Sequence, residues 1–280
     1  NFVFSTPQKY LKNATCFNRV TISATCSPNL ANWIYEPYVF HSSSDIANAR
    51  PNVKDFIETY TLTHELYARM IQLSVEVNQC RGDKMRKKNA RDLLWETQNY
   101  HLYVYNGKSS LSNKKNRRKA FQNLISAEKI LRENSDFIEH CNGYDLSMSG
   151  YKEYIAKFTN YNAYVSQKGG AIFELDVVEN AVNYCDIEQR NETLDQINDT
   201  YRKKILSDHL LEENQLAVFT NGLNPPHEIL PNRIYSEISF DRTKREVTLF
   251  VSLLFGKKKL PVSIVKKLFF TEGGIQAQYI

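Results

Sequence analysis

Carboxylates recur at two places in this sequence at spacings that could hold a metal ion. Glu174, Asp176 and Glu179 follow the pair Gly169-Gly170, and a nuclease could use such a trio to bind a divalent cation. However, no lysine follows at the close spacing that such nucleases use. A second set falls on one stripe of an expected helix: Glu188, Glu192, Asp195 and Asp199. A di-metal site would also need a histidine three residues after a glutamate, so this set is better explained as a face that is solvated or paired with basic residues.

Histidine and cysteine add only isolated candidates. Asp136 and His140 stand four residues apart beside Cys141, which could hold a metal but is more typical of a surface pair near a helix end. His64-Glu65 lacks the second histidine of a zinc-protease motif. None of the five cysteines forms a C-x-x-C pair, which argues against a zinc ribbon or finger. We therefore predict no metal site and no cofactor.

Motifs for phosphate binding and nucleophilic catalysis are incomplete. Gly107-Lys108-Ser109-Ser110 matches the end of a phosphate-binding loop, but the glycine that this motif needs five residues earlier is Leu102. The sequence contains no G-x-S-x-G elbow and no dinucleotide-binding fingerprint. We predict no catalytic residue and favour a protein without enzymatic activity.

Charge is the most informative pattern in the chain. Residues 81–119 carry twelve basic side chains against three acidic ones, whereas residues 171–213 carry eleven acidic against four basic. Several lysines and arginines fall in the first turns of an expected helix, where cations oppose the helix dipole. A sequence that accepts this cost could be using the charge to bind a phosphate backbone. Alternatively, the basic segment pairs with the acidic segment of the same chain, or is simply solvated.

We therefore predict a non-enzymatic binding or assembly protein whose basic surface faces nucleic acid or another polyanion. Tyrosines between the basic clusters could stack on bases. The residues expected on this surface are Arg86, Lys87, Lys88, Arg91, Tyr103, Lys114, Lys115, Arg117, Arg118, Lys119, Lys257, Lys258 and Lys259. The alternatives are a secreted, surface or virion structural protein that contacts protein partners, and a metal-dependent nuclease.

Hydrophobic periodicity divides the chain into three segments that must position these residues. Residues 1–45 favour strands and turns, 46–221 a helical block, and 222–280 strands again. Because neither β segment suffices alone, we predict an α+β fold in which N- and C-terminal strands form a shared sheet around or beside the helical block. The clearest strand signal is the alternation over 247–255, and apolar residues on its other face predict burial on both sides.

Five helices are expected inside the block. The first runs from Pro51 to Gly82 and continues over 83–96, and the next spans 113–141 with Ser112 as its N-cap and Glu128 on its inner face. Ser149 is expected to cap a third that ends at Gly169-Gly170, and 171–212 to hold a fourth and fifth. For residues 100–105, the pattern fits either a strand or a continuation of the helix.

Composition says less about the cellular setting. An excess of Phe, Tyr, Ile, Asn and Lys over Gly, Ala, Arg and Pro indicates an AT-rich genome. The odd cysteine count favours a reducing compartment, although Cys16 and Cys26 could close a loop in an oxidising one. No apolar run reaches the ~18 residues of a membrane helix, so we expect no transmembrane segment.

Overall fold

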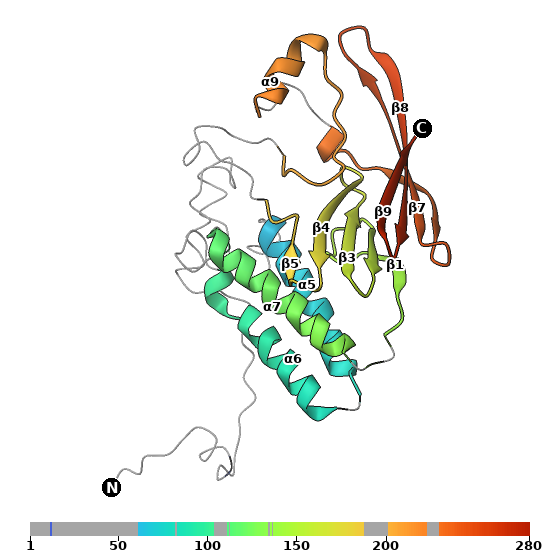
Figure 1. Cartoon of the computed structure of the whole chain (residues 1–280). Helices are drawn as coiled ribbons and strands as arrows, with labels where there is room; N and C mark the ends of the chain where they lie inside the picture. Colours follow the sequence, from blue (N-terminus) through green and yellow to red (C-terminus); the bar gives the residue numbers. More distant parts are fainter. Residues whose placement is uncertain are drawn as a thin grey trace. The chain divides into compact units, whose positions relative to one another are not determined.

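The computed structural model describes Lys12 and residues 61–81, 83–103, 111, 113–133, 135, 137–187, 201–222 and 230–280. Contacts divide the chain into Asn1–Phe56 and Ile57–Ile280. Every element below belongs to the second unit, in which helices come first and strands follow (Figure 1).

Three helices near the start of this unit share an apolar core. They are α5 (Thr61–Gln79), α6 (Lys84–Thr97) and α7 (Lys114–Arg132), with the short 3-10 turn η2 (Tyr100–Tyr103) after α6. Asp83 begins α6 by accepting hydrogen bonds from the backbone N–H groups of Met85 and Arg86, and Asn113 begins α7 in the same way. Buried side chains from all three helices meet, including Leu66, Leu73, Leu94, Leu124 and Ile125.

The first sheet is antiparallel, with neighbouring strands consecutive in the chain. Its strands are β1 (His140–Tyr144), β2 (Glu153–Lys157), β3 (Tyr161–Ser166), β4 (Ala171–Val177) and β5 (Val182–Asn183). Gly169 and Gly170 turn the chain between β3 and β4 with φ of 80° and 55°. A Cβ on Gly170 would lie 2.8 Å from the ring of Tyr235, so this tight turn requires glycine.

The second sheet is a four-stranded antiparallel meander. It is formed by β6 (Ser236–Asp241), β7 (Glu246–Phe255), β8 (Leu260–Thr271) and β9 (Gly274–Tyr279). Short helical turns lie in the segments that precede it: η3 (Glu213–Gln215), α9 (Leu216–Thr220) and η4 (Leu230–Asn232).

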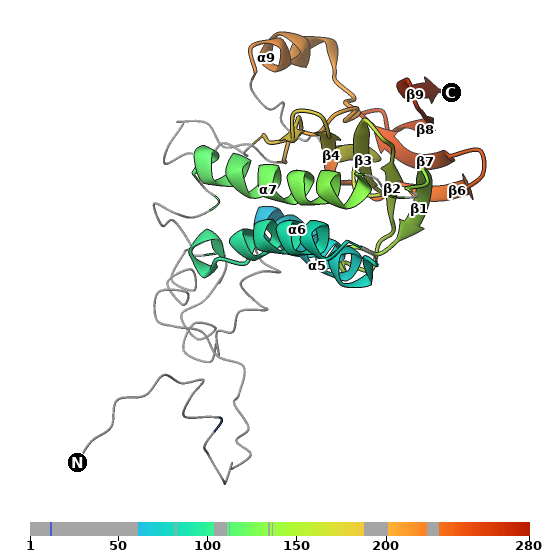
Figure 2. The same ribbon diagram turned by 60° about the horizontal axis from the view of Figure 1, so that its bottom comes forward.

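The first sheet lies between the second sheet and the helices, as Figure 2 shows. Tyr154 and Val165 on one of its faces belong to the same buried apolar cluster as Leu249 and Leu268 of the second sheet. The opposite face bonds to α5 and α7 through polar side chains described below. Because both faces are covered, every residue of β2 and β3 is buried.

The α+β class is confirmed. Within the described residues, the first expected helix and its continuation over 83–96 are also confirmed, as two separate helices, α5 and α6. The helix predicted over 113–141 is shorter than expected: it begins after Asn113 rather than Ser112 and ends at Arg132. Asn142-Gly143, which was expected to end it, lies inside β1. Residues 100–103 form a 3-10 turn rather than a strand.

The helix predicted from Ser149 to Gly169-Gly170 and the two predicted over 171–212 are wrong: β2 to β5 lie in this part of the chain, and the described residues 201–212 hold no helix. Strands buried on both faces show no polar-apolar alternation, and their apolar runs mimic a helical stripe. The strand predicted over 247–255 is confirmed as β7, but its predicted burial on both faces is wrong. Buried Val247, Leu249 and Val251 alternate with more exposed neighbours, and Leu254 is 63% exposed.

The expected N-terminal strands lie outside the described residues, and so does the acidic stripe expected over 188–199. Whether N- and C-terminal strands share a sheet therefore stays a prediction. The boundaries at 45/46 and 221/222 stay predictions. A possible Cys16–Cys26 loop is also outside, whereas Cys80, Cys141 and Cys185 are free thiols.

Candidate functional site

A pocket of about 240 Å³ opens beside the first sheet, where α5 meets β4 and the connection from β1 to β2. Charged, hydroxyl and aromatic side chains line it. They come from residues His64, Glu65, Ala68, Leu146, Ser147, Ser149, Tyr151, Glu153, Ser166, Lys168, Phe173 and Lys204. Two carboxyl groups and two ammonium groups therefore share one small concave site.

Glu153 begins β2 and holds the preceding loop against the sheet. Its Oε2 accepts hydrogen bonds from the backbone N–H groups of Leu146 (2.8 Å) and Ser147 (3.4 Å), and its Oε1 accepts one from Ser147 Oγ (2.6 Å). Burial raises the pKa of this carboxyl above its usual value, although the three hydrogen bonds act in the opposite direction. Glu153 thus retains a proton to higher pH than an exposed glutamate.

Glu65 supplies the second carboxyl group from the first turns of α5. It forms an ion pair with Arg202, and the two side chains are only 11% and 10% exposed. Arg202 also donates to the backbone carbonyls of Cys185 and Ile187, which fixes the guanidinium. The two glutamates therefore occupy different environments: Glu65 faces a cation, and Glu153 faces neutral donors.

Lys204 and two aromatic rings complete the pocket. The Nζ of Lys204 lies 5.7 Å from the centre of the Phe173 ring, and burial lowers the pKa of this ammonium. Tyr151 stands at the rim and is 44% exposed. The pocket thus has a buried amine above one ring and a second ring open to solvent.

A β-bulge in β4 brings Phe173 to this pocket. Tyr164 pairs with Glu174 and Val165 with Ile172, which leaves Phe173 as an extra residue without a partner on β3. Phe173 packs with Ala68 of α5, and Glu174 bonds to Arg69 of the same helix. Two consecutive residues of one strand therefore both face α5.

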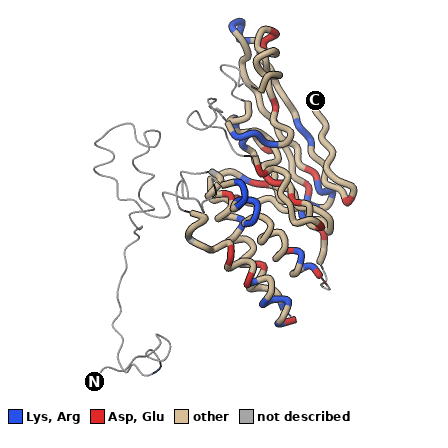
Figure 3. The backbone as a smooth tube through the Cα atoms, turned by 60° about the vertical axis from the view of Figure 1, so that its left-hand side comes forward, with Lys and Arg blue, Asp and Glu red and all other residues tan. Residues whose placement is uncertain are grey.

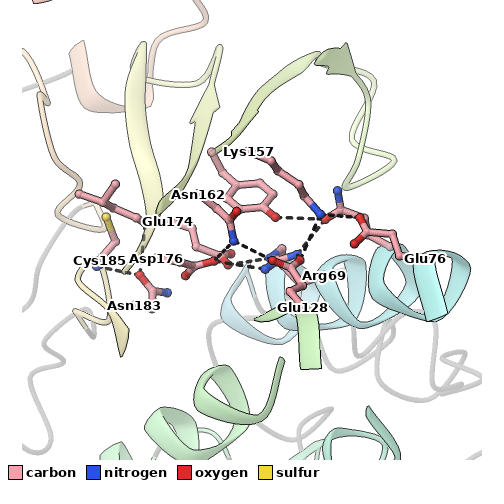
Figure 4. Close-up of polar contacts among 12 residues, drawn as sticks. Arg69, Glu76, Glu128, Lys157, Asn162, Glu174, Asp176, Asn183 and Cys185 are labelled. Atoms are coloured by element: carbon pink, nitrogen blue, oxygen red, sulfur yellow. Dashed lines mark hydrogen bonds and ion pairs between the residues drawn. The ribbon is translucent and has the colours of Figure 1, made fainter. Parts of the chain in front are cut away.

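Behind the pocket lies a buried charge cluster centred on Arg69, shown in Figure 4. This arginine contacts Glu174 Oε1 through Nε (2.6 Å), Glu128 Oε1 through one terminal nitrogen (2.9 Å) and Asp176 Oδ2 through the other (3.3 Å). Its guanidinium also lies 4.4 Å from the centre of the Tyr164 ring. All of these side chains are buried.

Three cations surround Glu128 within this cluster. Arg69, Lys157 and Arg132 all pair with its carboxylate. Burial alone would raise the pKa of Glu128, but these three charges lower it below its usual value. Asn162 Nδ2 donates to both Glu128 and Asp176, so the amide links the two acids.

Glu174 and Asp176 lie together at the centre of the cluster. Burial raises the pKa of both carboxyls, most strongly that of Glu174, although Arg69 acts in the opposite direction. Among the described residues, no donor meets Glu174 Oε2 or Asp176 Oδ1, which fits a protonated carboxyl in this pair. Because no pocket residue reaches this pair, it supports the site rather than reacting in it.

The predicted polyanion-binding residues fall in separate places, as the blue segments of Figure 3 show. Arg86 to Arg91 lie on α6, Lys114 to Lys119 on the first turns of α7, and Lys257 to Lys259 at the turn between β7 and β8. Exposed members of the set are Lys88, Lys114, Lys115, Arg118, Lys119, Lys257, Lys258 and Lys259.

Several members of the predicted set have structural partners instead. Arg117 is 2% exposed and pairs with Asp186, which lies in the acidic segment, and Arg118 contacts the same carboxylate at 3.7 Å. Lys87 Nζ donates to the carbonyls of Asn78 and Cys80 at the end of α5. The hydroxyl of Tyr103 donates to the backbone carbonyl of Thr97, and its side chain packs against the apolar core of the helices.

The acidic trio near Gly169-Gly170 is split by the fold. Glu174 and Asp176 enter the buried cluster around Arg69, whereas Glu179 is exposed. His140 lies in β1, and its Nδ1 contacts the carbonyl of Ile138. Within the described ranges, no group of three or more His, Cys, Asp or Glu side chains could hold a metal ion.

Sequence reasoning noted Glu65 and His64 but missed the rest of the pocket. Glu153, Tyr151 and Lys168 were hidden because their segment was assigned to a helix. Arg69 offered a signal that was not used: it stands three residues after Leu66 and four before Leu73, on the apolar stripe of its helix.

No family model matches this chain, and no curated protein does. Among solved structures, the chain is similar to the 4-alpha-glucanotransferase from Thermococcus litoralis, with 22% sequence identity and a TM-score of 0.67. The match covers 89% of this chain and 39% of that one. The chain therefore shares a fold with part of that enzyme and spans well under half of its length.

This likeness corrects the functional prediction. A non-enzymatic nucleic-acid-binding or structural protein was expected, but the solved structure that the chain resembles is an enzyme whose name refers to glucan transfer. The absence of a membrane helix is supported for the part of the chain that the structure describes, where no helix is long and apolar enough to span a bilayer.

Proposed function

We propose that this chain is part of a glycosidase-like enzyme and that the pocket lined by Glu65 and Glu153 binds the sugar at the bond to be cleaved. Its fold similarity to a 4-alpha-glucanotransferase supports the enzyme class. The observation that carries the proposal is the presence of two glutamates in different electrostatic environments within one pocket. Glycoside cleavage needs such a pair.

Glu153 acts as the general acid in this proposal. Burial raises its pKa, so the carboxyl holds a proton that it can donate to the leaving glycosidic oxygen. The Ser147 hydroxyl, 2.6 Å from Oε1, orients the carboxyl group. Since Ser147 Oγ both donates and accepts, it can bond either protonation state.

Glu65 acts as the ionised partner. Its carboxylate, which pairs with Arg202, either attacks the anomeric carbon or activates a water molecule. Phe173 and Tyr151 offer apolar faces to the ring of the sugar, as aromatic side chains commonly do in ligand pockets.

The test incubates the full chain with maltooligosaccharides and with a panel of neutral and acidic oligosaccharides, and follows chain lengths by chromatography. We expect new products from at least one substrate. Glu153→Gln and Glu65→Gln should each lower the rate by about 10²-fold or more. Glu179→Gln is the matched control, because Glu179 is exposed and outside the pocket.

The pH profile supplies a second readout. Because Glu153 must be protonated to act, activity should fall as pH rises through its raised pKa, and Glu153→Gln should remove that limb of the profile. Saccharide binding without any change in chain length, or equal rates in both pocket variants and the control, would refute the assignment.

A further inference from the structure

The two carboxyls and two ammoniums of the pocket lining differ in their partners. Glu65 pairs with Arg202, which lies outside the lining. Glu153 accepts three hydrogen bonds from the loop that it holds. Neither carboxyl therefore forms an ion pair with Lys168 or Lys204.

Of these two ammoniums, Lys204 is the less exposed. Within the part of the chain that the structure describes, its Nζ has neither a hydrogen bond nor an ion pair, and its contact is with the ring of Phe173. By contrast, Lys157 pairs with two carboxylates, and Lys266 pairs with one carboxylate and donates to two backbone carbonyls. A partly buried ammonium without an anion is costly, and a ligand that brings one removes the cost.

The ammonium of Lys204 faces the sugar pocket. The same residue also borders a second pocket, with Lys203, Ser207, His209 and Phe219. However, the ring beneath Nζ, that of Phe173, belongs to the first pocket and not to the second. The neighbours that act on its charge, Glu65, Lys168 and Glu153, line the first pocket too.

We propose, on the premise that this pocket binds sugar, that its ligand is an acidic sugar of the uronic type whose carboxylate pairs with Lys204. A carboxylate carries a single negative charge and matches this one ammonium, whereas a sugar phosphate carries up to two. Lysine binds such an anion as a point charge, in keeping with the absence of an arginine from the lining. At about 240 Å³ the pocket is smaller than the roughly 300–1,000 Å³ typical of drug-sized ligands, so it accommodates one sugar ring.

The test titrates the full chain with glucuronate, galacturonate, glucose, glucose 6-phosphate and inorganic phosphate, by calorimetry or ligand-observed NMR. A uronate should bind about tenfold or more tightly than glucose, since a hydrogen bond to a charged group contributes that much. Lys204→Met should remove this preference, so that the uronates and glucose bind the variant equally tightly. Lys203→Met is the matched control, because Lys203 neighbours Lys204 but does not line this pocket.

The outcomes separate the two proposals. If neither neutral nor acidic sugars bind, the proposed function fails. If glucose binds as tightly as the uronates in the wild-type chain, the sugar pocket stands and the acidic ligand is refuted, whatever the variant does. Stronger binding of glucose 6-phosphate than of either uronate, or phosphate binding that Lys204→Met abolishes, would also overturn the uronate in favour of a phosphate. Thermal melting of the variant checks that a lost preference is not a lost fold.

Discussion

Replacing Arg69 by methionine tests whether the buried charge cluster holds the helices on the first sheet. The side chain is fully buried, and methionine keeps most of its length without its charge. Three carboxyl groups lose a partner in this variant: Glu128, Glu174 and Asp176. Breaking a buried ion pair from one side typically costs about 3–5 kcal/mol, because the other side is left uncompensated.

The three losses are unequal. Glu128 keeps Lys157 and Arg132, and Asp176 keeps the amide of Asn162. Glu174 loses its ion pair, and its raised pKa lets protonation limit the damage. We therefore expect a loss of about 3–5 kcal/mol rather than three times that value. Since small proteins are stable by about 5–15 kcal/mol, the variant should remain folded at low temperature but melt early.

Urea denaturation followed by circular dichroism measures the change in unfolding free energy. Arg81→Met serves as the control, because Arg81 is exposed at the end of α5 and should change stability by less than about 0.5 kcal/mol. A loss below about 1 kcal/mol for Arg69→Met would refute the reasoning, because it would mean that the carboxyl groups do not depend on this guanidinium.

Three further predictions concern stability. Glu174→Gln mimics the protonated acid. Because burial raises the folded-state pKa of Glu174, the wild type loses stability as pH rises above the usual pKa of a glutamate, whereas the variant does not. The variant should therefore gain on the wild type with rising pH in urea titrations, and parallel pH profiles of the unfolding free energy would contradict the raised pKa. Val251 is 5% exposed, so Val251→Asp should lower stability by several kcal/mol. Leu254 is 63% exposed, so Leu254→Asp should lower it by far less. Equal melting temperatures of the two variants would mean that β7 is not buried on one face only. A Cβ at Gly170 would lie 2.8 Å from an aromatic ring, whereas one at Gly150 would meet nothing within 4 Å. Gly170→Ala should therefore destabilise the chain more than Gly150→Ala. If calorimetry ranks the two variants in the reverse order, the backbone of the turn at Gly170 can shift to accommodate the methyl group.

The sequence alone was informative where one face of an element meets solvent. The stripes of α5 and α7 have a polar side, and β7 alternates, so these elements were predictable. Glu128 was also expected on the inner face of its helix, where it lies. Periodicity works for such elements because water and core impose different residue types on their two sides.

The central sheet was not predictable for the opposite reason. Tyr154, Ile155 and Phe158 are all buried, because the helices cover one face of the sheet and the second sheet covers the other. The spacing of these apolar residues then does not mark one face of the element, so a helix fits the pattern as well as a strand does. The pocket depended on this sheet, so Glu153 could not be placed beside Glu65 without it.

Charged residues misled for a related reason. A local count of lysines and arginines cannot tell an exposed cation from one with a partner distant in the sequence. Arg117 meets Asp186, 69 residues away, and Arg69 meets Asp176, 107 residues away. Only the tertiary fold reveals such partners.

The bulge in β4 has a consequence for how this site could arise and disappear. Phe173 has no partner on β3, so it is additional to an otherwise regular ladder. Deleting this one residue would leave Ile172 opposite Val165 and Glu174 opposite Tyr164, and the pairing would close without a shift. The buried acids would keep their positions while the pocket lost the ring beneath Lys204. A single codon thus separates a sheet with this pocket from a sheet without the Phe173 ring, and a lineage could alter the pocket here without rebuilding its core.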